Sequence, residues 1–176
     1  MWRDREPFRL PFKPEEIRPG ADLSLRDLRE MSFHSDNLQN ARFDGADLYR
    51  AYLSESDFSD SSFLDANLES VFATEAWFRR CDFRDSRLVW AYLAQSDFTD
   101  ANFEKAFLPR AVFQDAKLTR ANFSLCDLRG VVFWHADLTG ADFSGANLTG
   151  ADFTDAVLAA IRWDDAVLAG TIGLTR

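Results

Sequence analysis

The sequence predicts an all-β solenoid built from very short repeats, and two observations carry this prediction. Every fifth residue from Leu23 to Leu168 is Leu (15 times) or Phe (13 times), with Ala73 and Trp163 as exceptions. The residue two places before each of these positions is usually small. A period of five matches neither the 3.6-residue period of a helix nor the two-residue period of a strand. A fixed short period instead indicates a solenoid, in which each unit packs on its neighbours.

Within each five-residue unit, the Leu or Phe is the central residue and is expected to point inward together with the small residue before it. The units at 141–145 and 146–150 are clean copies, reading Ala-Asp-Phe-Ser-Gly and Ala-Asn-Leu-Thr-Gly. The Asp or Asn before the central residue and the Gly, Ser or Thr after it suit tight turns. Each unit is therefore predicted to form one short side that ends in a corner.

A second period, of 20 residues, groups the units into coils with four sides. Central residues 20 positions apart form columns in which the same residue type recurs. A five-residue repeat alone would not place Phe in one column and Leu in the next. One column contains Phe43, Phe63, Phe83, Phe103, Phe123 and Phe143, and the next contains Leu28, Leu48, Leu68, Leu88, Leu108, Leu128, Leu148 and Leu168. Burying each Leu or Phe contributes about 1.5–3 kcal/mol, so these columns are the main predicted source of stability.

On these residues the chain resembles the pentapeptide-repeat family, whose signature is A-(D/N)-(L/F)-x-x. The resemblance covers residues 21–170. It implies a right-handed quadrilateral parallel β-helix in which each pentapeptide forms one side. The thirty units then make about 7.5 coils of 20 residues, and a rod about 36 Å long at the roughly 4.8 Å spacing of strands.

The two ends depart from the repeat. Residues 1–20 are expected to form a leader that caps the core with Phe8, Leu10, Phe12 and Ile17, and Pro14 is expected to begin a short helical turn. Residues 171–176 form a short tail. The last coil and the tail leave an apolar group of residues: Ile161, Trp163, Val167, Leu168, Ile172 and Leu174. An open coil invites edge pairing, so either the last residues cover it or two copies meet there as a two-fold dimer.

Charge and composition limit the classes of partner. The chain has a net charge of −9, and residues 1–20 hold five basic and four acidic groups, which leaves 15 basic and 25 acidic groups on the repeats. This net charge of −10 disfavours nucleic acid and anionic membranes as direct partners and favours basic ones. No apolar run is long enough to span a membrane. The charged N-terminus does not match a secretory signal, so the expected compartment is the cytoplasm.

Motifs for chemistry are missing from the sequence, so we expect no enzyme activity, no cofactor and no metal. There is no Gly-rich phosphate loop and no Cys-x-x-Cys pair. His34 and His135 map about five coils apart and cannot share a metal. Cys81 and Cys126 both occupy the small-residue slot, where they are expected to be buried hydrophobic residues and not a redox pair.

The period of 20 assigns each outward residue to one of four sides, which we name after the central residues Phe43, Leu48, Leu53 and Phe58. The Phe43 side has a net charge of −5, the Leu48 side about +1 and the Phe58 side about −2. The Leu53 side has a net charge of −5 and contains no Lys or Arg. Its outer columns also hold Ser32, Gln95 and His135, but most of their residues are aromatic, apolar or acidic. The candidate face consists of these residues together with Trp90 at the adjoining corner: Tyr52, Phe72, Tyr92, Val112, Val132, Glu55, Glu75 and Asp115.

An aromatic stripe flanked by acids predicts a protein-binding face. Two alternatives stay open at this point: the rings form a ladder that only stabilises neighbouring coils, or the leader lies over part of the stripe. The sequence therefore favours a rigid, non-enzymatic protein-interaction module with an unidentified protein partner.

A second function follows from the resemblance alone, since some family members mimic B-DNA, bind DNA gyrase and protect it from quinolones. B-DNA carries one charge per about 1.7 Å, or roughly 21 charges over 36 Å. The repeats carry −10, less than half of that. The chain also shows neither an insertion that interrupts the repeats nor a long helical tail, both of which accompany that function in the family. Gyrase mimicry is therefore the alternative and not the first hypothesis.

Overall fold

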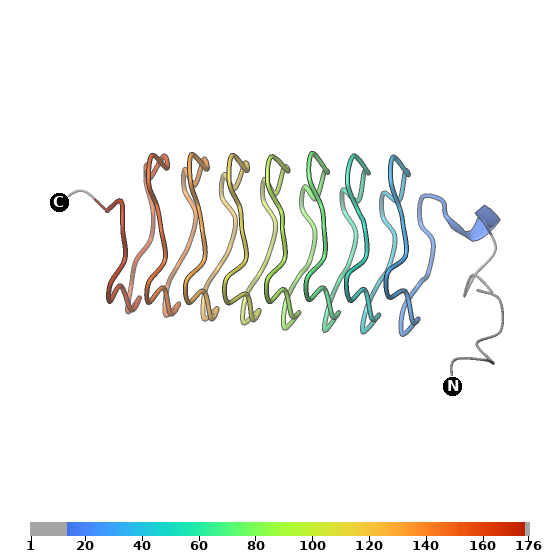
Figure 1. Cartoon of the computed structure of the whole chain (residues 1–176), viewed down its shortest axis with the longest axis horizontal. Coiled ribbons are helices and arrows are strands. Elements are labelled where there is room, and N and C mark those ends of the chain that lie inside the picture. The colour runs from blue at the N-terminus through green and yellow to red at the C-terminus, as the bar shows by residue number, and fades with distance from the viewer. Residues whose placement is uncertain (1–13, 175–176) are drawn as a thin grey trace, which may run out of the picture.

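The computed structural model describes residues 14–174, and within them the chain forms a straight stack of similar coils (Figure 1). The one helical element among the described residues is the 3-10 helix η1, Pro14–Glu16, which lies at the N-terminal end of the stack. The short helical turn expected at Pro14 is thus confirmed. Phe8, Leu10 and Phe12, which the sequence assigned to the cap, lie outside the described residues.

Parallel β-bridges join residues that are 20 positions apart, from Asp22–Arg42 at one end to Asp152–Ile172 at the other. The twenty-residue coil with four sides is therefore confirmed. Each bridge is isolated, and no strand extends beyond its bridge among residues 14–174. The bridges are isolated because the chain turns every five residues. Each side therefore has room for only one bridged residue before the next turn begins.

Each side ends in a turn, and the last residue of the side, which is the third residue of the turn, adopts a left-handed conformation. The non-glycine residues in this slot have φ angles between 55° and 65°. The commonest turn has a hydrogen bond across four residues, as from Ala41 N to Leu38 O at 3.1 Å. Positive φ at the third turn residue is the requirement of a type II turn. Gly45 meets a further demand in this slot, because a Cβ there would lie 2.7 Å from Leu25 Cδ2 of the preceding coil.

The core consists of the central and small residues, which are buried in the coils from Leu23 to Phe153. Phenylalanines of the Phe43 column stack face to face; Phe83, for example, lies 4.8 Å from Phe63 and 4.7 Å from Phe103 between ring centroids. A further Phe contacts this stack edge-on or tilted. It lies in the Phe58 column at Phe58, Phe78 and Phe98, of which Phe98 is tilted. It lies in the Leu53 column at Phe33, Phe113, Phe133 and Phe153.

The two ends of the stack differ in how well the core is covered. In the first coil Leu23 and Leu28 are fully buried, and Ile17 from the leader packs against the core. In the last coil the apolar residues are only partly buried, and Val167 and Ile172 are exposed. The partly buried group includes Ile161, Trp163, Leu168 and Leu174. Since Ile172 bridges to Asp152, the tail continues the Leu53 side through that residue.

Candidate protein-binding face

The aromatic column of the Leu53 side is open to solvent, as the sequence predicted. The exposed fractions of Tyr52, Phe72 and Tyr92 are 49%, 44% and 39%. The rings of Tyr52 and Phe72 stack, with centroids 5.6 Å apart and an interplanar angle of 11°, and Tyr92 follows at 6.5 Å in a tilted arrangement. Val112 and Val132 continue the column and are half-buried. The column is thus a ladder of neighbouring rings and also an exposed apolar surface.

The slot that these rings occupy is polar on most of the other sides for a local reason. An Asp there accepts a hydrogen bond from the backbone two residues later, as Asp57 Oδ1 does from Ser59 N at 2.9 Å. This Asx interaction is a standard way to stabilise a turn. Tyr52, Phe72 and Tyr92 cannot make it. Their turns therefore give up a local hydrogen bond and gain ring contacts between coils.

Trp90 lies at the corner between the Leu48 side and the Leu53 side. It is 54% exposed and takes a left-handed conformation with a φ angle of 58°. The guanidinium of Arg110, from the same corner of the next coil, lies over its ring at 4.6 Å from the centroid. A cation–π contact of this kind holds both side chains in place. Trp90 thus borders the aromatic column, but one face of its ring is occupied by Arg110.

The acidic column runs along the opposite corner of the Leu53 side. Glu55, Glu75 and Asp115 are all exposed. Asp115 is 3.3 Å from His135, and Glu55 is 3.9 Å from His34. No ion pair joins Glu75 to another of the residues 14–174. The two histidines lie against different acids, and no group of three or more metal-binding side chains occurs among the described residues.

Trp77 is a part of this surface that the sequence reasoning missed. It belongs to the Phe58 side, is 42% exposed and lies just beyond the acidic column. A hollow of about 390 Å³, which we name the corner groove, spans the shared corner of the Leu53 and Phe58 sides. Its lining residues are Glu55, Glu75, Ala76, Trp77, Gln95, Asp97, Asp115 and Lys117. The sequence did contain a signal for Trp77. It is the one aromatic residue in a slot that on this side is mostly Asp, Asn or Lys.

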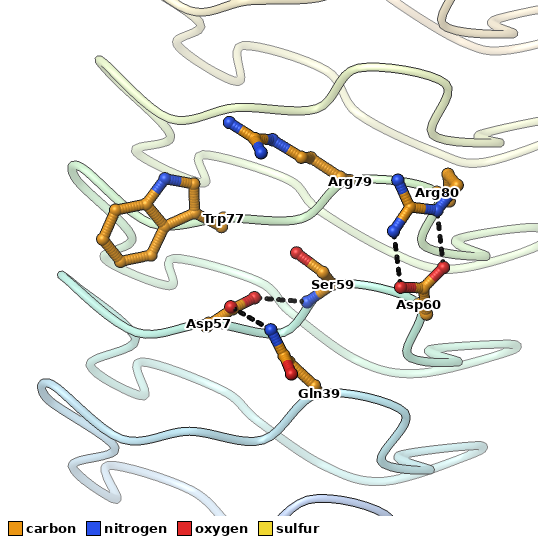
Figure 2. Close-up of a pocket in the computed structure, with 7 residues that line it drawn as sticks. All are labelled: Gln39, Asp57, Ser59, Asp60, Trp77, Arg79 and Arg80. Carbon is orange, nitrogen blue, oxygen red and sulfur yellow. Dashed lines mark hydrogen bonds and ion pairs between the residues drawn. The ribbon is translucent and has the colours of Figure 1, made fainter.

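On the Phe58 side, acids and bases alternate from coil to coil and pair with each other. Arg80 makes two hydrogen bonds of 2.6 Å to the carboxylate of Asp60 (Figure 2). Arg120 makes the same pair of hydrogen bonds with Asp100. These hydrogen bonds lower the pKa of both Asp60 and Asp100. Figure 2 shows Trp77 at one end of this side and the Arg80–Asp60 pair at the other.

Next to Trp77, the polar groups of the Phe58 side are also paired. Arg79 contacts Asp97 at 2.7 Å, and the amide of Gln39 donates a hydrogen bond to Asp57. Burial raises the pKa of Asp97, but hydrogen bonds from Thr99 and Arg79 outweigh it and the pKa is lowered. The charges of this side are therefore largely neutralised within the chain.

Buried serines shape the corner beneath the groove. The hydroxyl of Ser96 accepts a hydrogen bond from Ala76 N at 3.0 Å and donates one to Ala73 O at 2.7 Å. Ser56 makes the same two contacts with the coil before it, to Asp36 N and Phe33 O. In the usual turn, the backbone N–H of the fourth residue donates to the carbonyl of the first. At these corners the serine hydroxyl of the next coil bonds to both groups instead.

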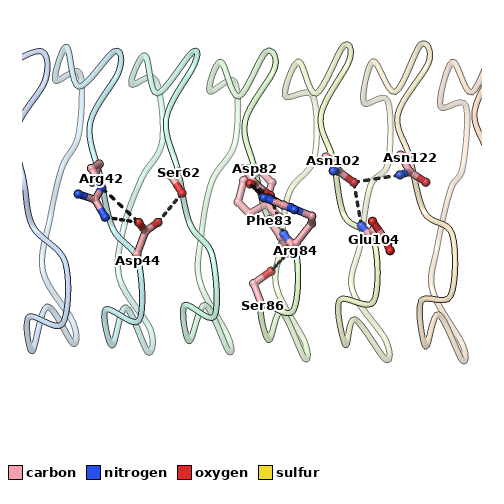
Figure 3. A network of polar contacts seen from close by, with 10 residues as sticks. All are labelled: Arg42, Asp44, Ser62, Asp82, Phe83, Arg84, Ser86, Asn102, Glu104 and Asn122. Atoms are coloured by element: carbon pink, nitrogen blue, oxygen red, sulfur yellow. Dashed lines mark hydrogen bonds and ion pairs between the residues drawn. The ribbon is translucent and has the colours of Figure 1, made fainter.

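The Phe43 side, on the far side of the coil, carries its own polar network (Figure 3). Arg42 pairs with Asp44 at 2.9 Å, and Arg84 pairs with Asp82 at 2.6 Å. Asn122 donates a hydrogen bond to Asn102 of the preceding coil at 3.0 Å. The rings of Tyr52, Phe72, Tyr92 and Trp77 and the corner groove thus belong to the Leu53 and Phe58 sides. The Phe43 side resembles the Leu53 side only in its net charge of −5.

Other reactive groups are not arranged for chemistry in the part of the chain that the structure describes. The thiols of Cys81 and Cys126 are buried and donate hydrogen bonds to Phe58 O and Phe103 O. Burial raises the pKa of both thiols, which keeps them protonated and unreactive.

Among residues 14–174, no helix has the length and apolar character required to cross a bilayer.

Comparison with known proteins gives a family model and several solved structures. The model "Pentapeptide repeats" matches in 8 copies, at residues 37–72, 46–85, 61–100, 86–124, 96–134 and 126–162. No curated protein matches the chain. HetL, a pentapeptide repeat protein involved in heterocyst differentiation regulation from the cyanobacterium Nostoc sp. strain PCC 7120, is 28% identical with a TM-score of 0.51. The alignment covers 90% of this chain and 81% of HetL.

Two further solved structures are similar. QnrB1, a plasmid-mediated fluoroquinolone resistance protein in its trypsin-treated form, is 23% identical with a TM-score of 0.69, and the alignment covers 85% of this chain and 75% of QnrB1. Rfr23 from the cyanobacterium Cyanothece 51142 is 28% identical with a TM-score of 0.50, over 52% of this chain and 63% of Rfr23. These likenesses imply that the coils form a right-handed quadrilateral β-helix.

Proposed function

This chain belongs to the pentapeptide-repeat family, and from that premise we propose that it is a non-enzymatic, rigid interaction module whose Leu53 side holds a protein partner. One observation carries the proposal. The column of exposed rings lies on the one side that has no Lys or Arg, so its rings and acids are not covered by cations of their own side. Exposed aromatic residues are enriched in protein interfaces.

The rigidity of the coil supports this role. Every side of each coil is bridged to the next coil, and the core is packed without interruption from Leu23 to Phe153. A partner therefore meets a surface that is already ordered, and little conformational entropy is lost on its side of the interface.

Site-specific photo-crosslinking in extract of the native host tests the proposal. A photoreactive phenylalanine is placed at Phe72 and, as the matched control, at Asn122, which holds the same repeat slot on the opposite Phe43 side. We expect a discrete crosslinked species from position 72 that is absent from position 122. Equal crosslinking from the two positions, or none from position 72, would contradict the proposal.

Gyrase mimicry is the second candidate, favoured by the two acidic sides, Phe43 and Leu53, which lie opposite each other with a net charge of −5 each. The likeness to QnrB1 supports the fold that this function needs. The test is gyrase supercoiling with ciprofloxacin: protection at micromolar protein supports mimicry, and no effect at tens of micromolar excludes it.

We also propose that two copies meet at the C-terminal end. The central residues Leu158, Trp163 and Leu168 are only partly buried, whereas the same columns are fully buried in the preceding coils. A two-fold contact would cover them and pair the open edge. Light scattering at two concentrations should give twice the chain mass of 20.1 kDa at the higher one. A monomer mass at both concentrations would exclude the dimer.

A further inference from the structure

The corner groove has more acid than the chain itself neutralises. Four carboxylates line it, against one cation, Lys117. Two of these acids already have partners, since Asp97 contacts Arg79 at 2.7 Å and Asp115 lies 3.3 Å from His135. Glu55 and Glu75 are the other two. Glu75 has no ion pair with another described residue, and the nearest partner of Glu55 is His34 at 3.9 Å.

Trp77 supplies an aromatic face beside these acids. The chain places its own arginines on two other rings: Arg110 lies 4.6 Å from the centroid of Trp90, and Arg87 lies 5.1 Å from that of Phe107. Trp77 is 42% exposed, but no cation of residues 14–174 lies over its ring. An exposed indole bordered by carboxylates is a favourable site for a guanidinium.

We propose that the corner groove binds arginine side chains of a basic protein segment, with Glu55, Glu75 and Trp77 as the contacting residues. The inference rests on the proposed function and names the chemistry of the partner. Arginine fits better than lysine, because its planar group stacks on an indole and forks to carboxylate oxygens. Glu55 and Glu75 hold the same slot on successive coils, about 4.8 Å apart along the axis.

A protein segment fits this surface better than other cationic ligands. The aromatic column of Tyr52, Phe72 and Tyr92 lies on the other flank of the acidic column and offers apolar contact for residues next to the arginines. A nucleic acid would place phosphates against Glu55, Glu75 and Asp115, which repel them. The partner is therefore an arginine-rich segment that also carries apolar or aromatic side chains.

The test uses the full-length protein and three labelled eight-residue peptides in which serine alternates with arginine, lysine or glutamate. Fluorescence anisotropy at low salt measures the affinities. We expect the arginine peptide to bind about threefold more tightly than the lysine peptide, and the glutamate peptide not to bind. Binding should weaken as salt is added, because the contacts are exposed ion pairs.

Two double variants distinguish peptide binding at the corner groove from nonspecific attraction of a basic peptide to an acidic protein. Glu55→Gln with Glu75→Gln removes the two available acids, and Gln95 shows that glutamine is accepted in this column. Asp65→Asn with Asp85→Asn is the matched control: these exposed acids hold the same left-handed slot, at the diagonally opposite corner. The first variant should weaken arginine-peptide binding about five- to tenfold, and the control should change it less than about twofold.

Trp77→Val removes the ring and introduces a residue that the same column carries at Val157. It should abolish the preference for arginine over lysine. Circular dichroism confirms that each variant is folded. Equal loss of binding in the two double variants, binding of the glutamate peptide, or no binding of the arginine peptide would each overturn the inference. A crosslinked partner at position 72 together with any of these results would leave the proposed function standing.

Discussion

The Leu53 side and the Phe58 side share a corner, a backbone ladder and a core, but their outer residues are partnered differently. On the Phe58 side, Asp60 and Asp100 face Arg80 and Arg120 of the following coils at 2.6 Å. On the Leu53 side there is no Lys or Arg, and the outer columns hold rings and acids. The Phe58 side pairs Asp60 and Asp100 with its own arginines, whereas the Leu53 side leaves its aromatic rings exposed and Glu75 without an ion pair to another of the residues 14–174.

This difference shows that the outer residues of a side can vary without a change in its core. The inward residues are a small residue and usually a Leu or Phe on all four sides, and they are buried whichever outer residues the side carries. Outer columns are then free to vary. A side whose charged outer residues pair between coils adds a little stability, whereas the Leu53 side keeps exposed rings and acids on its surface.

The largest effect is expected at the corner that the two sides share. Ser96→Ala removes a buried hydroxyl that satisfies both Ala76 N and Ala73 O. Leaving such groups unpaired costs about 1–3 kcal/mol of unfolding free energy. Chemical denaturation of the purified variant measures the loss.

Ser61→Ala is the control for this prediction at the next corner of the coil. Ala41 N bonds to Ser61 Oγ at 2.9 Å but also to Leu38 O at 3.1 Å, so the backbone donor keeps a partner when the hydroxyl is removed. Its loss should be clearly smaller than that of Ser96→Ala. Equal losses of unfolding free energy in the two variants would show that the backbone partner of Ala41 N does not compensate for the missing hydroxyl.

A smaller effect is expected from the ion pairs of the Phe58 side. The hydrogen bonds from arginine lower the pKa of Asp60 and Asp100 below the ordinary value of 3.8, so their contribution is present above about pH 4 and is lost as pH falls through the lowered values. Asp60→Asn with Asp100→Asn should lower Tm by about 1–3 °C at pH 7 and low salt.

The pH dependence distinguishes this effect from a packing defect. The difference in Tm between wild type and the Asp60, Asp100 double variant should shrink as pH falls below 4, and it should also shrink in 1 M salt. A difference that stays constant with pH and salt would refute the ion-pair explanation.

A comparably small effect on stability is expected in the aromatic column. Phe72→Val replaces a ring that is 44% exposed with the residue type that Val112 and Val132 carry in the same column. Losing the stack on Tyr52 should cost about 0.5–1 kcal/mol. A loss of 3 kcal/mol or more, typical of a buried Phe, would mean that the column is a structural ladder and not a binding face.

The repeat arithmetic was sufficient to predict most of the fold. Counting by five located the buried residues, and counting by 20 paired Asp22 with Arg42 and every bridge that follows. Both counts succeed because each side has the same length and no insertion shifts the register. The isolated nature of the bridges did not follow from the counts, because it depends on the turn at every corner.

The candidate face was predicted only in part. The exposure of Tyr52, Phe72 and Tyr92 follows from their slot alone, and it is confirmed. Trp77 was missed because it belongs to another side, and the corner groove joins residues of two sides across a corner. The ion pairs between coils were missed as well, since net charge per side does not show that Asp60 lies against Arg80.

The most direct test of the account uses the tryptophan indole signals in a nitrogen-proton correlation spectrum, titrated with the arginine–serine peptide. Trp77 lies in the corner groove, whereas Trp163 lies in the last coil of the core. We expect the Trp77 indole signal to shift progressively with peptide while the Trp163 signal stays in place, and we expect Glu55→Gln with Glu75→Gln to suppress the shift. An unchanged Trp77 signal, or an equal shift at Trp163, would contradict the account.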